Sequence, residues 1–293
     1  MNIAREYSDK LVDVKYYFHE AELDEGEKAR CTIVFVHGLR DHSGTHSFFF
    51  NQLNQEGCHI LSFDLLGHGY SGGERCSIDD YQHHVELVWQ SIIRALREHI
   101  PQQIPVVIMG YSYGFSLVIH ALHDLSSKHK SIKRILQNRV ALVVGLSPAF
   151  KVGHTASPVV RFFSPVLSLV SRYVKNIPLM SMNTEQITDD ALVMNAIETD
   201  PRVFKGKINV QTARNVYVAG RTALKLLPEL KLPFLLLFGS EDFVLPVDEE
   251  DIKDCDDVEV RIFLGGKHNI FDGDNIFAGR TLESILRSIE RYC

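Results

Sequence analysis

Cysteine is scarce in this chain, and the few cysteines are widely spaced. The 293 residues contain five of them, which are Cys31, Cys58, Cys76, Cys255 and Cys293. No two form a C-x-x-C pair, and an odd number cannot all be joined as disulfides within one chain. The pattern argues against a disulfide-rich secreted domain and against a zinc ribbon. It predicts reduced thiols and a cytoplasmic location.

Long apolar runs and excess positive charge are also missing. No stretch approaches the roughly 18 uncharged apolar residues that a membrane-spanning helix needs. Residues 1–10 are polar, so we expect no signal peptide. The chain has 31 Lys and Arg against 37 Asp and Glu, a net charge of −6, and no basic run. We therefore expect no nucleic-acid partner, because phosphate-backbone binding depends on clustered positive charge.

The hydrophobic and charged contents are ordinary for a globular protein. Hydrophobic residues make up 45% and charged residues 23% of the chain. Those values exclude a disordered, collagen-like or coiled-coil protein. The length suits one large α/β domain or two smaller domains.

Short apolar runs alternate with helical patterns along most of the chain. The runs that read as buried strands are residues 31–36, 58–63, 106–109, 140–144, 234–238 and 258–264. Residues 12–18 alternate in polarity, as an antiparallel edge strand does. Residues 81–96 have helical periodicity after an apparent capping box from Ser77 to Asp80, and a last amphipathic helix includes Ser284 to Ile289. The sequence predicts an α/β fold with a mostly parallel central sheet flanked by helices.

A G-x-S-x-G motif at Gly110 to Gly114 predicts a nucleophilic serine at Ser112. A nucleophile elbow needs a strand before the serine and a helix after it, and residues 106–109 and 115–122 fit those roles. The sharp turn strains the serine backbone and leaves room only for glycine two positions away on each side. Ser71 lies in a second match to the motif. It is followed by a polar loop and no helix, so we interpret it as a turn residue.

The base is predicted from chain order. In this kind of site the acid follows the serine and the histidine follows the acid. His268 is the only histidine after residue 154, and it follows the strand-like run 258–264. Loops after parallel strands carry the chemistry of α/β sheets. We therefore predict that His268 removes the proton of Ser112.

The acid should lie in the loop after the preceding strand. Asp242 follows the run 234–238, and a carboxylate there can accept a proton from the imidazole and fix its tautomer. Neighbouring Glu241 is the main alternative and Asp248 a weaker one. Asp272, four residues beyond His268, is interpreted as a helix cap.

Backbone amides of two loops are predicted to form an oxyanion hole. One is the amide of Tyr113, after the nucleophile, and the other is the amide of Leu39, after the strand at 31–36. Three histidines follow that strand, at positions 37, 42 and 46. Their spacing matches no common zinc pattern and no cysteine or carboxylate cluster joins them, so we expect no metal and no cofactor.

Five blocks of sequence together resemble the monoglyceride lipase and lysophospholipase-like branch of the α/β-hydrolase superfamily, which includes serine aminopeptidase-type hydrolases. The blocks are His37 to Gly44, Phe63 to Arg75, Gly110 to Gly114, Thr199-Asp200-Pro201 with Lys205-Gly206-Lys207, and Pro233 to Ser240 followed by Asp242. The resemblance covers nearly all of the chain after about residue 10.

The resemblance implies a fold, a site and a substrate class. It implies an α/β-hydrolase core at residues 1–149 and 221–293, with a helical cap at 150–220 inserted after the sixth strand of that fold. It implies a triad of Ser112, Asp242 and His268, with Leu39 and Tyr113 forming the oxyanion hole. The implied substrates are single-chain lipid esters, either monoacylglycerols or lysophospholipids. Relatives often have a small residue at position 39 and methionine at 113, so a narrower acyl pocket is expected here.

Other functions remain open at this stage. A serine aminopeptidase or a general small-ester esterase would use the same triad, and Asp189, Asp190 and Glu198 are compatible with binding an α-amine. A non-catalytic receptor on the same fold is less consistent with a full set of triad residues.

An apolar stretch in the expected cap suggests what the cap contacts. Its residues are Val159, Val160, Phe162, Phe163, Val166, Leu167, Leu169 and Val170. They pack inside the cap, line an acyl channel, or give transient contact with a membrane surface.

Overall fold

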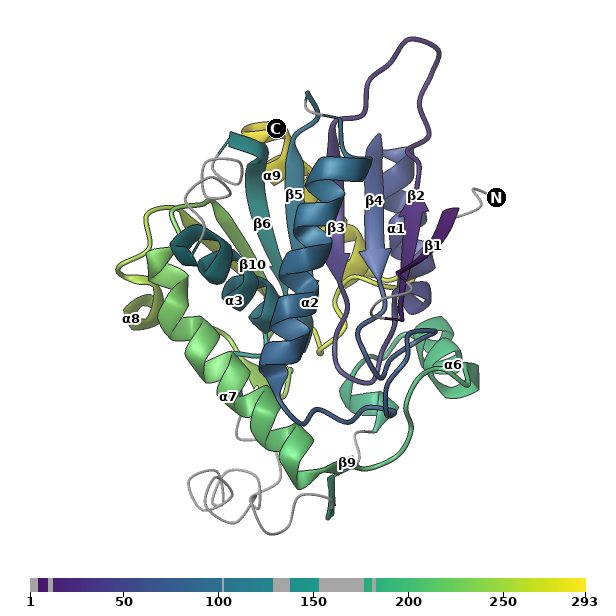
Figure 1. Cartoon of the computed structure of the whole chain (residues 1–293), viewed down its shortest axis with the longest axis vertical. Helices are drawn as coiled ribbons and strands as arrows, with labels where there is room; N and C mark the ends of the chain where they lie inside the picture. The colour runs from purple at the N-terminus through teal and green to yellow at the C-terminus, as the bar shows by residue number, and fades with distance from the viewer. Residues whose placement is uncertain (1–4, 10–12, 102, 129–137, 153–176, 181–182) are drawn as a thin grey trace.

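The computed structural model describes residues 5–9, 13–101, 103–128, 138–152, 177–180 and 183–293. Its centre is an eight-stranded sheet (Figure 1) with the strand order β1-β2-β4-β3-β5-β6-β10-β12. The strands are β1 (Arg5–Asp9), β2 (Val14–His19), β3 (Cys31–Val36), β4 (Cys58–Phe63), β5 (Val106–Tyr111), β6 (Val140–Leu146), β10 (Phe234–Gly239) and β12 (Val258–Phe263). The mostly parallel sheet predicted from the apolar runs is confirmed.

Six of the strands form a parallel series, and the two pairings at one edge of the sheet are antiparallel. β3 pairs with β4 and with β5, and the parallel series continues through β6 and β10 to β12. β2 is antiparallel to β4, as the alternating pattern predicted. β1, which no sequence pattern indicated, pairs antiparallel with β2 at that edge.

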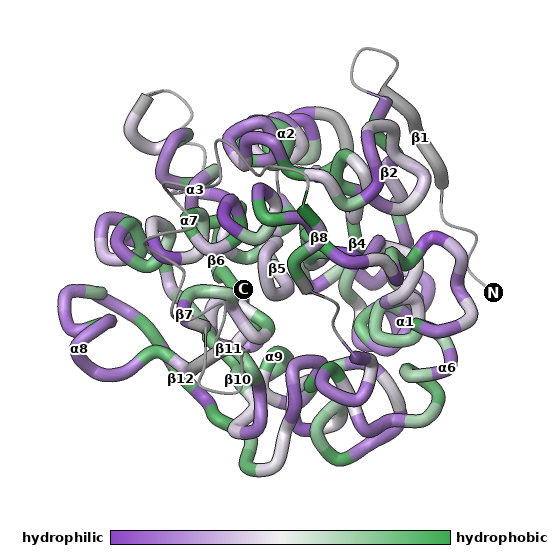
Figure 2. Tube along the Cα trace, turned by 90° about the horizontal axis from the view of Figure 1, so that it is seen from below, coloured by the Kyte–Doolittle hydropathy of each residue, from purple (hydrophilic) through white to green (hydrophobic). Residues whose placement is uncertain are grey.

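Helices cover both faces of the sheet. α2 (Tyr81–Arg94), α3 (Tyr113–Lys128) and α7 (Val210–Leu226) lie on one face, and α1 (Ser47–Gln55) and α9 (Ile276–Tyr292) lie on the other (Figure 1). Because strand side chains alternate between faces, Val34 and Val36 pack into one apolar core while Ile33 and Phe35 pack into the other. The hydropathy colours alternate along α2 and α7 in Figure 2, as they do in helices with one buried side.

Short elements complete the described chain. The helices are η1 (Ser43–His46), η2 (Ala95–His99), η3 (Thr184–Gln186), α6 (Ala191–Thr199), η4 (Leu227–Glu229) and α8 (Glu249–Ile252). Two small sheets pair β7 (Lys151–Val152) with β11 (Val244–Leu245), and β8 (Pro178–Met180) with β9 (Ile208–Asn209). Within the described ranges, no helix combines the length and apolar character needed to cross a bilayer.

One sequence prediction changes in detail. The helix at 81 is capped by Asp80, whose side chain accepts from the amide of Gln82, and not by a box beginning at Ser77. Asp80 is the cap because the helix begins one residue after it. Ser77 lies too far upstream to reach the free amides of the first helical turn. The boundary expected at residue 220 lies inside α7, a helix that packs against α3 and α2.

The expected cap follows β6, the sixth strand, and its described parts are residues 150–152, 177–180 and 183–220. The apolar stretch from Val159 to Val170 lies outside the described residues, so its interpretation stays a prediction. Figure 1 shows α6 and β9 at the end of the molecule where the parallel strands terminate, and Figure 2 views the molecule from this end. The loops after β3, β5, β6, β10 and β12 therefore meet beside the described part of the cap.

Candidate active site

Ser112 lies in a strained turn between β5 and α3. Its φ is 52°, a left-handed conformation that is costly for a residue with a side chain. A methyl group at position 110 would lie 2.5 Å from the Cα of Phe115, and one at 114 would collide with the carbonyls of Val36 and His37. Both glycines of the motif are thus required by close backbone approach, and the turn is a nucleophile elbow.

His268 and Asp242 form a line of hydrogen bonds that ends at the serine. His268 Nε2 lies 2.8 Å from Ser112 Oγ, and Nδ1 lies 2.8 and 2.9 Å from the two carboxylate oxygens of Asp242. His268 is 3% exposed and Asp242 is 6% exposed, whereas Ser112 is partly open to solvent. A carboxylate at Nδ1 keeps the proton there and leaves Nε2 free to accept the serine proton.

The imidazole of His268 is also held by packing and by its own backbone. Phe243 and Tyr111 pack on it, with ring centroids 4.3 and 5.1 Å away. The carbonyl of His268 accepts a 2.6 Å hydrogen bond from the hydroxyl of Ser147, which follows β6. These contacts fix the ring between Asp242 and Ser112.

The loop after β3 brings a second set of amides to Ser112. A Cβ at Gly38 would lie 3.3 Å from the Cβ of Ser112, so the backbone of this loop passes beside the nucleophile. The amide of Tyr113 is the first of α3 and has no acceptor within the helix. The loop that carries Leu39 and the start of α3 at Tyr113 thus both lie beside Ser112, and the helix start favours negative charge there.

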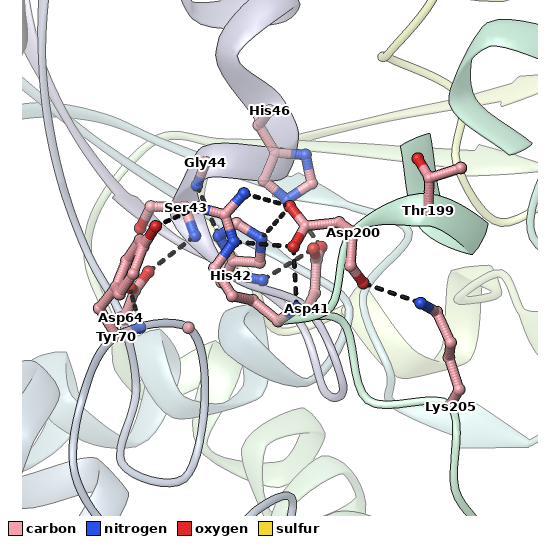
Figure 3. A network of polar contacts seen from close by, with 12 residues as sticks. Asp41, His42, Ser43, Gly44, His46, Asp64, Tyr70, Thr199, Asp200 and Lys205 are labelled. Carbon is pink, nitrogen blue, oxygen red and sulfur yellow. Dashed lines mark hydrogen bonds and ion pairs between the residues drawn. The ribbon is translucent and has the colours of Figure 1, made fainter. Parts of the chain in front are cut away.

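The loop after β3 is bonded to a segment from the expected cap. The amide of Phe204 donates to the carbonyl of Arg40 (3.0 Å), and Arg40 Nε donates back to the carbonyl of Phe204 (2.8 Å). His42 Nε2 lies 3.1 Å from Asp200 Oδ2, and Figure 3 shows Asp200 between this histidine and Lys205. The loop that carries Leu39 is therefore held from outside the core.

The other end of the same segment is bonded to the loop that carries His268. The amide of Asn269 donates to the carbonyl of Ile187 (2.7 Å), and Lys267 Nζ lies 2.5 Å from Asp189. Residues 185–204, with α6 between them, thus connect the loop of Leu39 to the loop of His268. The sequence analysis missed this connection, because no local pattern indicates which distant loops a segment will contact.

Comparisons with known proteins show the family of this chain. The family model for serine aminopeptidases, S33, matches residues 27–275. The chain belongs to the serine aminopeptidase S33 family. Proteins with other names are also similar to the chain. A monoacylglycerol lipase of Mycolicibacterium smegmatis is 24% identical over 247 residues, covering 83% of this chain and 82% of the relative. A monoglyceride lipase homolog of Monkeypox virus is 24% identical over 265 residues, covering 89% and 88%.

Solved structures share the fold of this S33 family chain. A soluble variant of monoglyceride lipase from Saccharomyces cerevisiae, in complex with a substrate analog, superposes with a TM-score of 0.79 at 15% identity, covering 100% of this chain and 95% of that one. The monoacylglycerol lipase of Paleococcus ferrophilus superposes with a TM-score of 0.73 at 22% identity, covering 96% and 99%. The predicted α/β-hydrolase fold and the resemblance to the monoglyceride lipase branch are confirmed, and the chain is a serine ester hydrolase.

The alternative site residues of this S33 member lie in other roles. Ser71 Oγ donates to the carbonyl of Asp64 (2.7 Å) and accepts from the amide of Lys15 (3.0 Å), as a buried turn residue does. Glu241 is exposed, and Asp248 caps α8 and pairs with Lys151. Asp242 is the carboxylate that reaches His268.

Asp272 was interpreted wrongly as a helix cap. Asn275 caps α9, accepting from the amides of Phe277 and Ala278. Asp272 instead lies 2.6 Å from Nδ1 of His46. A cap must lie immediately before the helix, and α9 begins four residues after Asp272.

The three histidines after β3 contact protein groups through their ring nitrogens. His37 Nε2 accepts from the amide of Leu65 (2.9 Å), His42 contacts Asp200, and His46 lies between two carboxylates. Over the described part of the chain, no cluster of three or more histidine, cysteine or acidic side chains has the arrangement of a metal site.

Burial of neutral histidines predicts a loss of stability in acid. Burial lowers the pKa of His84 to about 4, and it also lowers the pKa of His37 and His68, whose rings follow one another behind the loop of Leu39. Their folded pKa values lie below the unfolded value, so the stability they contribute is present above about pH 6.5 and is lost as pH falls toward 4. His84 alone should account for about 3 kcal/mol.

Urea unfolding at pH 7 and at pH 4.5 measures this loss. A His84→Gln variant should lose less free energy of unfolding between the two pH values than the wild type. Parallel pH dependence in the two proteins would contradict the assignment, whatever their absolute stabilities.

Proposed function

We propose that this protein hydrolyses single-chain lipid esters, monoacylglycerols or lysophospholipids, through an acyl-enzyme on Ser112. The observation that carries the proposal is the unbroken line of hydrogen bonds from Asp242 through His268 to Ser112. A serine hydroxyl is a poor nucleophile, and an imidazole at 2.8 Å with its other nitrogen on a carboxylate is the arrangement that activates it.

The proposed reaction has two halves. Ser112 Oγ attacks the ester carbonyl while His268 Nε2 takes its proton, and the oxyanion forms beside the amides of Leu39 and Tyr113. His268 then protonates the leaving alcohol, and the acyl group stays on Ser112. In the second half His268 removes a proton from water, which attacks the acyl-enzyme, and His268 then returns the proton to Ser112 Oγ as the fatty acid leaves.

Each supporting group has a separate task in this proposal. Asp242 orients the imidazole and stabilises the imidazolium that forms during both proton transfers. Each oxyanion donor contributes about 100- to 1,000-fold in kcat, because it is already directed at the position where charge develops. The strained backbone of Ser112 holds the hydroxyl beside the imidazole and beside the oxyanion donors.

The charges around the site favour an ester over a peptide with a free α-amine. An aminopeptidase needs a carboxylate available to that amine. Asp189 pairs with Lys267, and Asp190 accepts from the amides of Leu192 and Val193 and from Asn275. Two of the three cap carboxylates that suggested amine binding are therefore already engaged. The relatives named monoacylglycerol lipase or monoglyceride lipase support a glycerol ester.

We also propose that residues 150–220 act as the cap of this enzyme over the core formed by 1–149 and 221–293. Support comes from the described segment 185–204, which contacts the loops on both sides of Ser112. The apolar stretch from Val159 to Val170 would then line the acyl channel or contact a membrane surface.

A substrate panel tests the proposal. It contains p-nitrophenyl esters from acetate to palmitate, a monoacylglycerol, a lysophospholipid and an aminoacyl-p-nitroanilide, each assayed with wild type and Ser112→Ala. We expect the highest kcat/KM on a single-chain lipid ester and none above background in the variant. A preference for acetate over every long chain would favour a small-ester esterase, and turnover of the anilide alone would favour an aminopeptidase.

A further inference from the structure

A buried histidine between two carboxylates connects the two loops that complete the site. His46 is fully buried, with Nε2 2.7 Å from Asp41 and Nδ1 2.6 Å from Asp272. Asp41 lies two residues after Leu39, and Asp272 lies four residues after His268. Asp41 and His46 are visible in Figure 3, beside the network of His42 and Asp200.

The protonation of this trio follows from its surroundings. Burial alone would lower the pKa of His46, but the two carboxylates outweigh burial and raise the pKa to about 10. The pKa of Asp41 is held well below its usual range by the same histidine. At neutral pH the trio is therefore an imidazolium between two carboxylates, with a charged hydrogen bond from Nδ1 to Asp272 and an ion pair between Nε2 and Asp41.

Aromatic side chains surround the His46 ring and leave it little freedom. Phe35, Tyr111 and Phe271 have ring centroids 5.0, 5.7 and 5.2 Å from it. Tyr111 packs on His46 and also on His268, so one ring contacts both histidines. A change in the position of His46 is therefore transmitted to the base by direct contact.

The Asp272 end of the trio is tied to the residue next to the base. The amide of Asp272 donates to Asn269 Oδ1 (3.0 Å), and Asn269 Nδ2 donates to Asp272 Oδ2 (3.1 Å). Asn269 directly follows His268 in the chain. On the other side, the amide of His42 donates to Asp41 Oδ1 (2.8 Å), which fixes the loop of Leu39 to its carboxylate.

Net stability is a weak explanation for such a trio. Removing three charged groups from water costs several kcal/mol per ion, and well-packed apolar residues often give equal or greater stability. The short charge-assisted hydrogen bond to Asp272 instead fixes the direction of the His46 ring, and the ion pair fixes its distance from Asp41. A displacement of about 1 Å in a catalytic site can cost about 100-fold in rate, so such a fixed connection has a large effect on turnover.

We propose that Asp41, His46 and Asp272 form a positioning bridge that holds the oxyanion loop at the correct distance from the loop of His268. None of the three contacts the reacting atoms. The inference rests on the proposed roles of Ser112, His268 and Leu39, and it adds residues that determine kcat without binding substrate.

Two conservative variants, His46→Gln and Asp272→Asn, test the bridge. A short soluble ester, p-nitrophenyl butyrate, gives kcat and KM, and a fluorophosphonate gives the rate of labelling at Ser112. We expect kcat and the labelling rate to fall about 10- to 100-fold with KM within about two-fold of wild type. The double variant should lose no more than the worse single variant, because the three residues act as a unit.

His120→Gln is the matched control. His120 is buried and bonded to the carbonyl of Ala219 at the contact of α3 with α7, outside both loops. It should lose stability while keeping kcat. Thermal unfolding identifies variants that fail to fold. If His46→Gln and Asp272→Asn do not fold, Asp41→Asn replaces them in the test, because the Asp41 side chain is 14% exposed.

The outcomes separate this inference from the proposed function. Folded bridge variants that keep wild-type kcat and labelling rate, even with a lower unfolding temperature, would show a purely structural role and overturn the inference. Wild-type protein that fluorophosphonate does not label would instead contradict the proposed nucleophile. Losses that simply add in the double variant would contradict a single bridge.

Discussion

Replacing Ser112 with alanine should lower kcat for ester hydrolysis by about 10⁶-fold, to little more than background. The variant keeps the elbow glycines, Asp242 and His268, so the fold and the substrate pocket remain. It removes the one hydroxyl that lies 2.8 Å from the imidazole. Stopped assays with p-nitrophenyl butyrate over several hours measure a residual rate this small.

Ser71→Ala is the matched control, because Ser71 occupies the same motif in a loop without a following helix. Its hydroxyl bonds to Asp64 and Lys15, so its loss should cost about 1 kcal/mol of stability and leave kcat within a few-fold of wild type. The reverse result, an active Ser112→Ala and an inactive Ser71→Ala, would identify Ser71 as the nucleophile.

Asp242→Asn should lower kcat by about 10⁴-fold while leaving the fold intact. An amide at position 242 can donate a hydrogen bond to Nδ1, which stabilises the tautomer whose proton is on Nε2. That tautomer cannot accept the proton of Ser112. The amide also provides no charge to stabilise the imidazolium. Steady-state kinetics on a soluble ester, with circular dichroism to verify folding, measures the effect.

Glu241→Gln is the control for Asp242→Asn. Glu241 is exposed and its side chain lies outside the line from Asp242 to Ser112, so the variant should keep kcat within two-fold of wild type. A fall in kcat for Glu241→Gln as large as that for Asp242→Asn would contradict the assignment of Asp242 as the acid.

The residues of the site could be predicted from sequence because their signals are local or ordered along the chain. The elbow is encoded by two glycines and a strand-helix junction within about ten residues. His268 was selected because no other histidine follows residue 154. The loops after the strands at 234 and 258 then brought Asp242 and His268 to the same sheet edge.

The contacts that hold these loops could not be predicted, because their partners are far apart in sequence. His46 and Asp272 are separated by 226 residues, and His42 and Asp200 by 158. A carboxylate shortly before a helix fits the pattern of a cap, and this led to the wrong interpretation of Asp272. Only the packed structure shows that Asn275 takes that role and that Asp272 faces a buried histidine.

The local errors have a similar cause. Ser77 and Asp80 both suit a helix start, and the choice between them depends on where the helix begins against α7, whose Asn215 and Thr212 bond to the residues before Tyr81. The edge strand β1 was missed because its residues are polar and it gains order by pairing with β2. Tertiary contacts decided both cases.

The nucleophile can be identified by finding which residue is labelled after reaction with a fluorophosphonate. Wild-type protein would be labelled, digested and analysed by peptide mass spectrometry, with Ser112→Ala treated in parallel. The account predicts one adduct, on Ser112, and none in the variant. An adduct on Ser71 or another residue, or full ester turnover in protein that takes no label, would contradict it.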